Sequence, residues 1–149
     1  MSKEFENFFY RIGSLIPGFK GYKTKEDFRD SDYRIRLYVK RSLELFITKI
    51  ERFKRDLNDD DLIKFDFFQK ELKIFSVKII NQKYGYSSFF SGESLEESSQ
   101  NLKTIIEHDQ SFINLIEEID GLEEINQQLI MTYIDSLNSI LDKRNLLMS

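Results

Sequence analysis

The sequence predicts an all-α protein, an antiparallel bundle of three to four long helices with a short amphipathic helix at the N-terminal end. Strong helix breakers are rare, because Pro17 is the single proline and only three of the six glycines lie beyond Gly21. Between them, apolar residues recur every three or four positions, the spacing of one helix face. We expect the whole chain, residues 1–149, to form one helical-bundle domain.

The amino-acid composition excludes several classes of protein and of functional site. Apolar residues make up 40% of the chain and aromatic residues 14%, which is too apolar for a disordered protein. The chain has no cysteine, so thiolate metal sites and redox chemistry at sulfur are excluded. The sequence lacks an apolar run long enough for a signal peptide or a bilayer span. We therefore expect a cytoplasmic protein.

The first predicted element is a short amphipathic helix over residues 3–15. Its apolar positions follow helical spacing. They are Phe5, Phe8, Phe9, Ile12 and Leu15.

A loop over residues 14–23 follows this helix. Gly18 and Gly21 permit left-handed backbone conformations that other residues avoid. The loop can then turn Phe19 and Tyr22 toward the interior of the bundle.

Two long helices are predicted next, and they form a hairpin. The first spans residues 24–57 with Thr24 as its N-cap, and the second spans residues 60–83. The expected buried positions of the first are Phe28, Ile35, Val39, Leu43, Phe46, Ile50, Phe53 and Leu57, and those of the second are Leu62, Phe65, Phe68, Leu72, Phe75 and Ile79.

A second loop that combines glycine with aromatic residues, residues 84–93, precedes the last two predicted helices. A Ser-x-x-Glu capping box that begins at Ser94 opens a helix over residues 94–119. Gly121 then separates it from a final helix over residues 122–147. Alternatively, Gly121 only kinks one continuous helix, because a lone glycine costs about 1 kcal/mol.

Charge is distributed unevenly along the chain. Residues 1–55 hold 14 Lys and Arg against 8 Asp and Glu, whereas residues 56–149 hold 8 against 18. We expect the acidic half to fold back on the basic half and partly neutralise it, because exposed charges usually form weak ion pairs. The alternative is that the basic half is an interaction surface.

The sequence predicts no catalytic, cofactor or metal site, and therefore no enzyme. His108 is the only histidine, and Ile105 stands where the Glu-x-x-His ligands of di-iron bundles require Glu. The acids at residues 59–61 lack the ligand spacing of a calcium loop and are expected to cap a helix. No glycine-rich phosphate loop is present, so no nucleotide or other small-molecule substrate is indicated.

Two carboxylates interrupt the apolar stripes. Asp32 and Asp109 each stand where a predicted helix calls for an apolar residue. A buried carboxylate must be paired or neutral, so we expect an ion-pair partner for each, with Arg29 or Arg36 as the candidates for Asp32. Such pairs fix helix register more often than they act as acid or base.

The two aromatic loops are the candidate binding segments. Their aromatic and basic side chains would suit an acidic protein partner or a nucleic-acid strand. The structural alternative is that the aromatic rings only close the open end of the bundle. The candidate partner-binding residues are Phe19, Lys20, Tyr22, Lys23, Tyr84 and Tyr86.

The first of these loops also carries a family resemblance. Its sequence Ile-Pro-Gly-Phe-Lys-Gly-Tyr-Lys, residues 16–23, leads into a charged segment with Lys25, Glu26 and Arg29. This run resembles the opening segment of a group of small, all-helical, uncharacterised bacterial proteins, in which a Pro-Gly-aromatic-x-Gly-Tyr stretch precedes a charged long helix. The resemblance covers residues 16–36 and implies a helical fold and a bacterial source, but no activity.

Three non-catalytic functions fit the sequence. The favoured one is a helical scaffold or adaptor that binds another protein. A peripheral membrane protein would place the N-terminal amphipathic helix and the basic loop on anionic lipid, and needs that helix undocked from the bundle. A nucleic-acid backbone binder is the third, and the acidic C-terminal half argues against it. Long helices often leave an apolar strip for a twofold partner, so a homo-oligomer is compatible with each.

Overall fold

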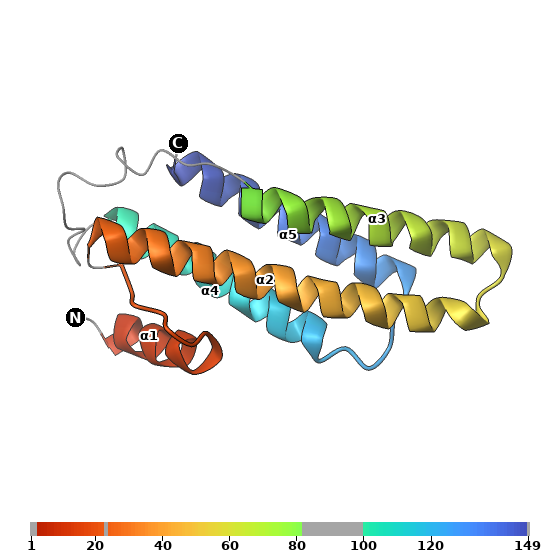
Figure 1. Cartoon of the computed structure of the whole chain (residues 1–149), viewed down its shortest axis with the longest axis horizontal. Helices are drawn as coiled ribbons and strands as arrows, with labels where there is room; N and C mark the ends of the chain where they lie inside the picture. The colour runs from red at the N-terminus through yellow and green to blue at the C-terminus, as the bar shows by residue number, and fades with distance from the viewer. Residues whose placement is uncertain (1–2, 23, 82–99, 149) are drawn as a thin grey trace.

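The computed structural model describes residues 3–22, 24–81 and 100–148. Within these ranges the chain forms five α-helices and one short 3-10 helix (Figure 1). This confirms the all-α bundle that the sequence predicts. The elements are α1 (Lys3–Leu15), α2 (Lys25–Phe53), η1 (Lys54–Asp56), α3 (Asp59–Asn81), α4 (Gln100–Asp120) and α5 (Gln127–Met148).

The four long helices pack as two antiparallel hairpins. One hairpin is α2 with α3, and the other is α4 with α5. The hairpins contact each other through α2 with α4 and through α3 with α5, and the two helices of each of these pairs run in the same direction (Figure 1). This arrangement places α3 and α4 at opposite corners of the bundle.

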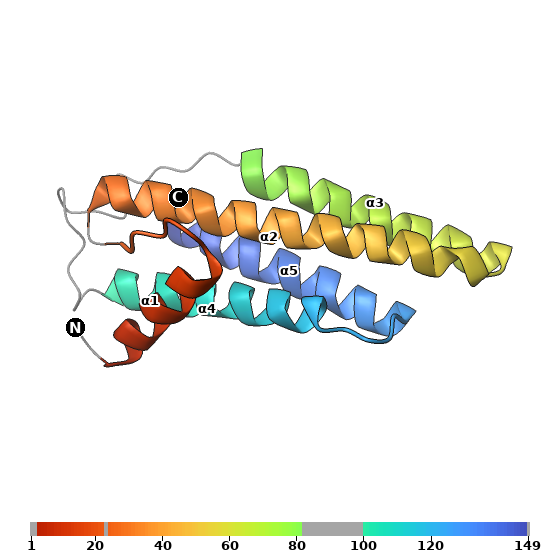
Figure 2. The ribbon, with the colours of Figure 1, turned by 60° about the horizontal axis from the view of Figure 1, so that its bottom comes forward.

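The short helix α1 lies against α4, as Figure 2 shows. Its bounds are those that the sequence predicts. Phe8 and Ile12 on its apolar face are fully buried, in a cluster that includes Leu102 and Ile105 of α4. The helix is therefore docked on the bundle through part of the apolar stripe that its spacing predicts.

Loop and cap geometry fixes the start of α2. Gly18 and Gly21 have φ angles of +83° and +79°, in the left-handed region that glycine tolerates best. Thr24 is the N-cap, as predicted, because its Oγ1 accepts a hydrogen bond of 3.1 Å from the backbone N–H of Asp27. The chain thus reverses direction between α1 and α2 at two glycines and a capping hydroxyl.

Two predicted helix ends are wrong. The helix predicted over residues 24–57 leaves α-helical geometry after Phe53 and continues as η1. The final helix begins five residues later than predicted, because Asn126 caps it: Asn126 Oδ1 accepts a 2.9 Å hydrogen bond from Leu129 N. Gly121 is a break between α4 and α5 rather than a kink. The capping box at Ser94 lies outside the described residues.

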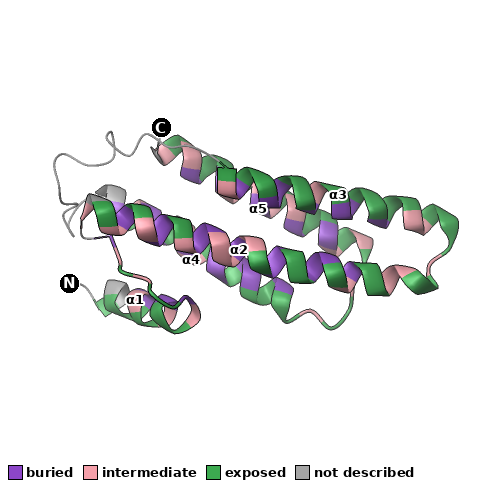
Figure 3. Ribbon diagram, in the orientation of Figure 1, coloured by how far each residue is buried: buried purple, intermediate pink, exposed green. Residues whose placement is uncertain are grey.

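The core follows the predicted stripes and forms two clusters. The larger cluster is shared by α2, α3, α4 and α5. The smaller one joins α1 and the loop after it to α2 as far as Ile35 and to α4 as far as Ile113. Buried residues line the facing sides of the helices in Figure 3, and exposed residues line their outer sides. Near the smaller cluster the interior also encloses charged side chains.

Gly18 and Gly13 provide a matched pair of glycine substitutions. A Cβ at Gly18 would lie 2.6 Å from Arg34 Nη1 and would keep a positive φ, so Gly18→Ala is expected to lower the free energy of unfolding by about 1–2 kcal/mol. Gly13 lies in α1, and a Cβ added there would meet nothing within 4 Å, so Gly13→Ala is expected to raise it by about 0.5–1 kcal/mol. Urea denaturation of both variants tests this. Equal effects of the two substitutions would contradict the described loop.

Candidate functional site

The most polar part of the interior is a group of charged side chains that we call the Arg144 cluster. It lies at the end of the bundle where α1 packs, and it draws residues from α2, α4, α5 and the loop before α2. Every member is buried. The members are Arg144, Asp109, Asp32, Arg36 and Tyr22.

The guanidinium of Arg144 binds two carboxylates at once. Its Nε donates to Asp109 Oδ1 at 2.7 Å and its Nη2 donates to Asp109 Oδ2 at 3.4 Å. Its Nη1 donates to Asp32 Oδ1. Asp109 belongs to the same hairpin as Arg144, whereas Asp32 belongs to the other. The planar fork of one arginine therefore joins the two hairpins.

Arg36 completes the charge balance. Its Nε donates to Asp32 Oδ2 at 3.0 Å, and its Nη1 donates to the carbonyl oxygen of Ile79 at 2.9 Å. Ile79 lies in the last turn of α3, where carbonyl oxygens have no partner within the helix. Two guanidinium groups thus offset two carboxylates, and one of them also caps α3.

Tyr22 attaches the loop to this cluster. Its hydroxyl donates a hydrogen bond to Asp109 Oδ2. Burial, with the charge of Asp109, raises the pKa of Tyr22 well above its usual value, so the phenol stays protonated. Burial acts to lower the pKa of Arg144, but the charges of Asp109 and Asp32 outweigh it and raise that pKa well above its usual value. The cluster is charged, buried and held by hydrogen bonds.

The structure places the predicted ion-pair residues as follows. Asp32 and Asp109 are both buried, and Asp32 pairs with Arg36, one of its two candidate partners. The other candidate, Arg29, lies on an exposed position. Arg144, which holds both carboxylates, was not among the sequence candidates, although it continues the spacing of Tyr133, Leu137 and Leu141 along α5.

The predicted partner-binding residues differ in where the structure places them. Tyr22 is 2% exposed and bonded to Asp109, so the interpretation of Tyr22 as a docking residue is wrong. Phe19 is half-buried, with its ring 5.6 Å from that of Tyr22. Lys20 is exposed. Lys23, Tyr84 and Tyr86 lie outside the described residues. The described aromatic rings close the end of the bundle.

Metal-binding geometry is not found in the part of the chain that the structure describes. No group of three or more His, Asp or Glu side chains there could hold a metal ion. His108 is half-buried, and its burial lowers its pKa. Of the described helices, none combines the length and the apolar character that crossing a membrane requires.

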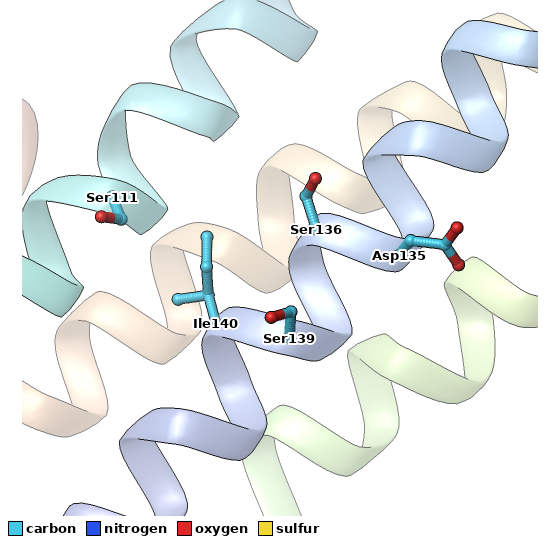
Figure 4. A pocket seen from close by; sticks show the side chains of 5 residues that line it. All are labelled: Ser111, Asp135, Ser136, Ser139 and Ile140. Atoms are coloured by element: carbon cyan, nitrogen blue, oxygen red, sulfur yellow. The ribbon is translucent and has the colours of Figure 1, made fainter.

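The described pockets are open depressions on the surface. One has a volume of about 420 Å³ and lies between α4 and α5, with Ser111 on the first helix and Asp135, Ser136, Ser139 and Ile140 on the second. Figure 4 shows that its one carboxylate, on Asp135, points away from Ser111. Another depression of about 430 Å³ lies beside Phe53 and Ile125. Neither brings together an acid, a base and a nucleophile.

The outer face of α3 carries a second apolar stripe. Ile63, Phe67, Ile74 and Val77 are 69%, 57%, 52% and 57% exposed. With Lys70 they occupy positions separated by four, three, four and three residues, which fall on one side of a helix. The buried residues of α3 lie on the opposite side (Figure 3). We call this stripe the α3 outer seam; it consists of Ile63, Phe67, Lys70, Ile74 and Val77.

Comparison of the chain with protein families, curated proteins and solved structures finds no match. The resemblance of residues 16–36 to a bacterial family therefore stays a prediction. The functional interpretation depends on the Arg144 cluster, the surface depressions and the α3 outer seam.

Loss of Arg144 should strongly destabilise the fold. Arg144→Ala leaves the carboxylates of Asp32 and Asp109 buried without their shared cation, and breaking such a pair costs about 3–5 kcal/mol. The neighbouring Lys143 is exposed, so Lys143→Ala is expected to change the free energy of unfolding by less than about 0.5 kcal/mol. Urea denaturation at neutral pH measures both. A loss below about 1 kcal/mol for Arg144→Ala would contradict a buried cluster.

Tyr22 should make the protein sensitive to alkali. Above about pH 10 the phenol ionises in the unfolded chain but not in the folded one, so the folded state binds more protons and stability falls as pH rises, by up to about 1.4 kcal/mol per pH unit from this residue. Tyr22→Phe is expected to be less stable at neutral pH and to decline less steeply above about pH 10. Tyr10→Phe, at a position 83% exposed, is expected to follow the wild type. An unchanged slope in Tyr22→Phe would contradict the buried phenol.

Proposed function

We propose that the chain is a non-catalytic helical adaptor that binds another protein through the α3 outer seam, and that the bound segment is an amphipathic helix. The observation that carries this proposal is the line of four exposed apolar side chains, Ile63, Phe67, Ile74 and Val77, on a helix whose other side already fills the core. Single exposed apolar residues are ordinary, but a contiguous stripe marks an interaction surface.

The spacing of the seam indicates the kind of partner. Alternating steps of four and three residues correspond to a repeat of 3.5, the period at which two helices pack along a shared seam. Each of the four apolar seam side chains is more than half exposed, so covering it would contribute about 1 kcal/mol, roughly half the value of burying a whole apolar side chain. A helix that presents an apolar stripe of the same period would cover all four.

The contacts of the buried polar side chains support a structural role for them. Asp32 and Asp109 are engaged by Arg36 and Arg144, and Tyr22 is locked in its protonated form, so these groups hold helices together. The absence of cysteine from the sequence fits a reducing compartment, and we propose the cytoplasm.

The position of α1 favours protein binding over membrane binding. A membrane-surface function needs the apolar face of α1 to insert into lipid. Phe8 and Ile12 of that face are instead packed in the core, whereas the seam on α3 is already at the surface. The adaptor function requires no rearrangement of the fold.

Site-specific photocrosslinking tests this proposal. A benzophenone amino acid replaces Phe67 in the chain as expressed in its own cells, and a control variant carries it at Tyr10, a more exposed aromatic position on α1. We expect discrete protein adducts from position 67 and none from position 10. Adding Ile74→Asp to the position-67 variant should lower adduct yield at least about tenfold, because a charge would be buried in the seam. Absence of adducts at position 67, or equal adducts at both positions, would contradict the proposal.

A further inference from the structure

We propose that the helix covering the α3 outer seam is α3 of a second copy of this chain, packed antiparallel. This inference rests on one part of the proposed function, that the α3 outer seam binds an amphipathic helix, and assigns that helix to a second copy of the chain instead of a different protein. The charged residues that border the seam support the antiparallel pair, because such residues set the partner and the orientation of paired helices.

Along each border of the seam, residues of opposite charge follow one another at a spacing of seven residues. Lys64 and Glu71 form one border, on the side where Lys78 pairs with Asp142 of α5 at 3.6 Å. Asp66 and Lys73 form the other border, on the side where Asp66 pairs with Lys54 of η1. Lys64 and Glu71 on one border and Asp66 and Lys73 on the other thus follow opposite charge orders along the helix, and Lys78 continues the first border.

This order is self-complementary in an antiparallel pair. When Ile63 of one copy lies opposite Ile74 of the other, the register brings Lys64 opposite Glu71 on one border and Asp66 opposite Lys73 on the other. Twofold symmetry repeats each contact. All four border contacts then join opposite charges.

Other arrangements of the same two helices bring like charges together. An antiparallel pair shifted by one heptad places Lys64 opposite Lys78, Glu71 opposite its own copy and Lys73 opposite its own copy. A parallel pair places Asp66 beside Glu71, Lys73 beside Lys78 and the two copies of Lys70 face to face in the seam. Like charges in these positions are destabilising. The borders therefore select one orientation and one register.

The centre of the seam fits this register, whereas at one end Val77 lies opposite Asp60 of the other copy. Ile63 and Ile74 of opposite copies meet in two apolar layers, and between them Lys70 lies opposite Phe67. The methylene stem of a lysine covers an aromatic ring well, and its ammonium group is attracted to the ring face. A single lysine in an otherwise apolar seam specifies register at some cost in stability.

The required side chains are accessible in the structure. Lys64, Lys70 and Lys73 are exposed, and Glu71 is half-buried. Asp66 keeps 61% of its side-chain surface exposed while it pairs with Lys54, so it can also meet a lysine of a second copy. The interface needs no unfolding of the bundle.

The mass of the purified chain in solution is the first test. Sedimentation equilibrium should give twice the 17.9 kDa of one chain at micromolar to millimolar concentrations. Ile74→Asp should shift the mass to one chain and weaken dimerisation at least about tenfold. The control is Met131→Asp, at a position 49% exposed on α5, which should remain dimeric. Circular dichroism verifies that both variants stay helical.

Charge exchange and engineered cysteines test the orientation. Lys64→Glu places acids opposite each other and should weaken the dimer, and Lys64→Glu with Glu71→Lys should restore it, because the border is again complementary. The chain has no native cysteine, so disulfides report only the introduced positions. A mixture of Ile63→Cys and Ile74→Cys chains should form a cross-linked pair, whereas each variant alone should not.

Three results would overturn the inference. They are a single-chain mass at all concentrations, failure of the double charge exchange to restore the dimer, and disulfides in the single-cysteine variants alone, which indicate parallel packing. A single-chain mass with photocrosslinks from position 67 to a different protein would overturn the dimer and leave the adaptor function standing. Loss of both the dimer and the photocrosslinks would overturn both proposals.

Discussion

The position of Arg144 between two carboxylates is the constraint on which the arrangement of the bundle depends. Its guanidinium binds Asp109 of its own hairpin and Asp32 of the other. A slide of one hairpin along the other would break the buried ion pair between Arg144 and Asp32, which is costly in the protein interior. Apolar side chains alone would tolerate small shifts more readily, because the hydrophobic effect has no direction. The cluster therefore fixes the register of the two hairpins.

Features with local physical causes could be predicted from the sequence. The bounds of α1, the cap at Thr24 and the stripes of the long helices follow from spacing and from side chains a few residues away. Arg144 was missed because a search for apolar stripes passes over a charged residue, even at the right spacing. The start of α5 was also predicted wrongly. Leu122 and Ile125 have helical spacing and pack on the core, but they lie before the first residue of the helix.

The α3 outer seam could not be located from the sequence of α3 alone. The helix α3 has apolar residues on two sides, and the 3.5-residue repeat of the seam can be seen in its sequence. Spacing indicated the side of α3 that enters the core, but it does not show whether the second apolar side is covered or exposed, because that depends on where the other helices pack. The expectation that long helices leave an apolar strip was general, and only the folded bundle places that strip on Ile63, Phe67, Ile74 and Val77.

The shared cation at Arg144 also has a consequence for how this chain can change over generations. Loss of any one of Arg144, Asp32, Asp109 or Arg36 removes a partner from a buried charge, whereas replacing a whole buried ion group by well-packed apolar residues is often neutral or better. Single mutations at these positions are therefore disfavoured, but joint replacement is tolerated. The four positions should be inherited as a set: either all ionic or all apolar.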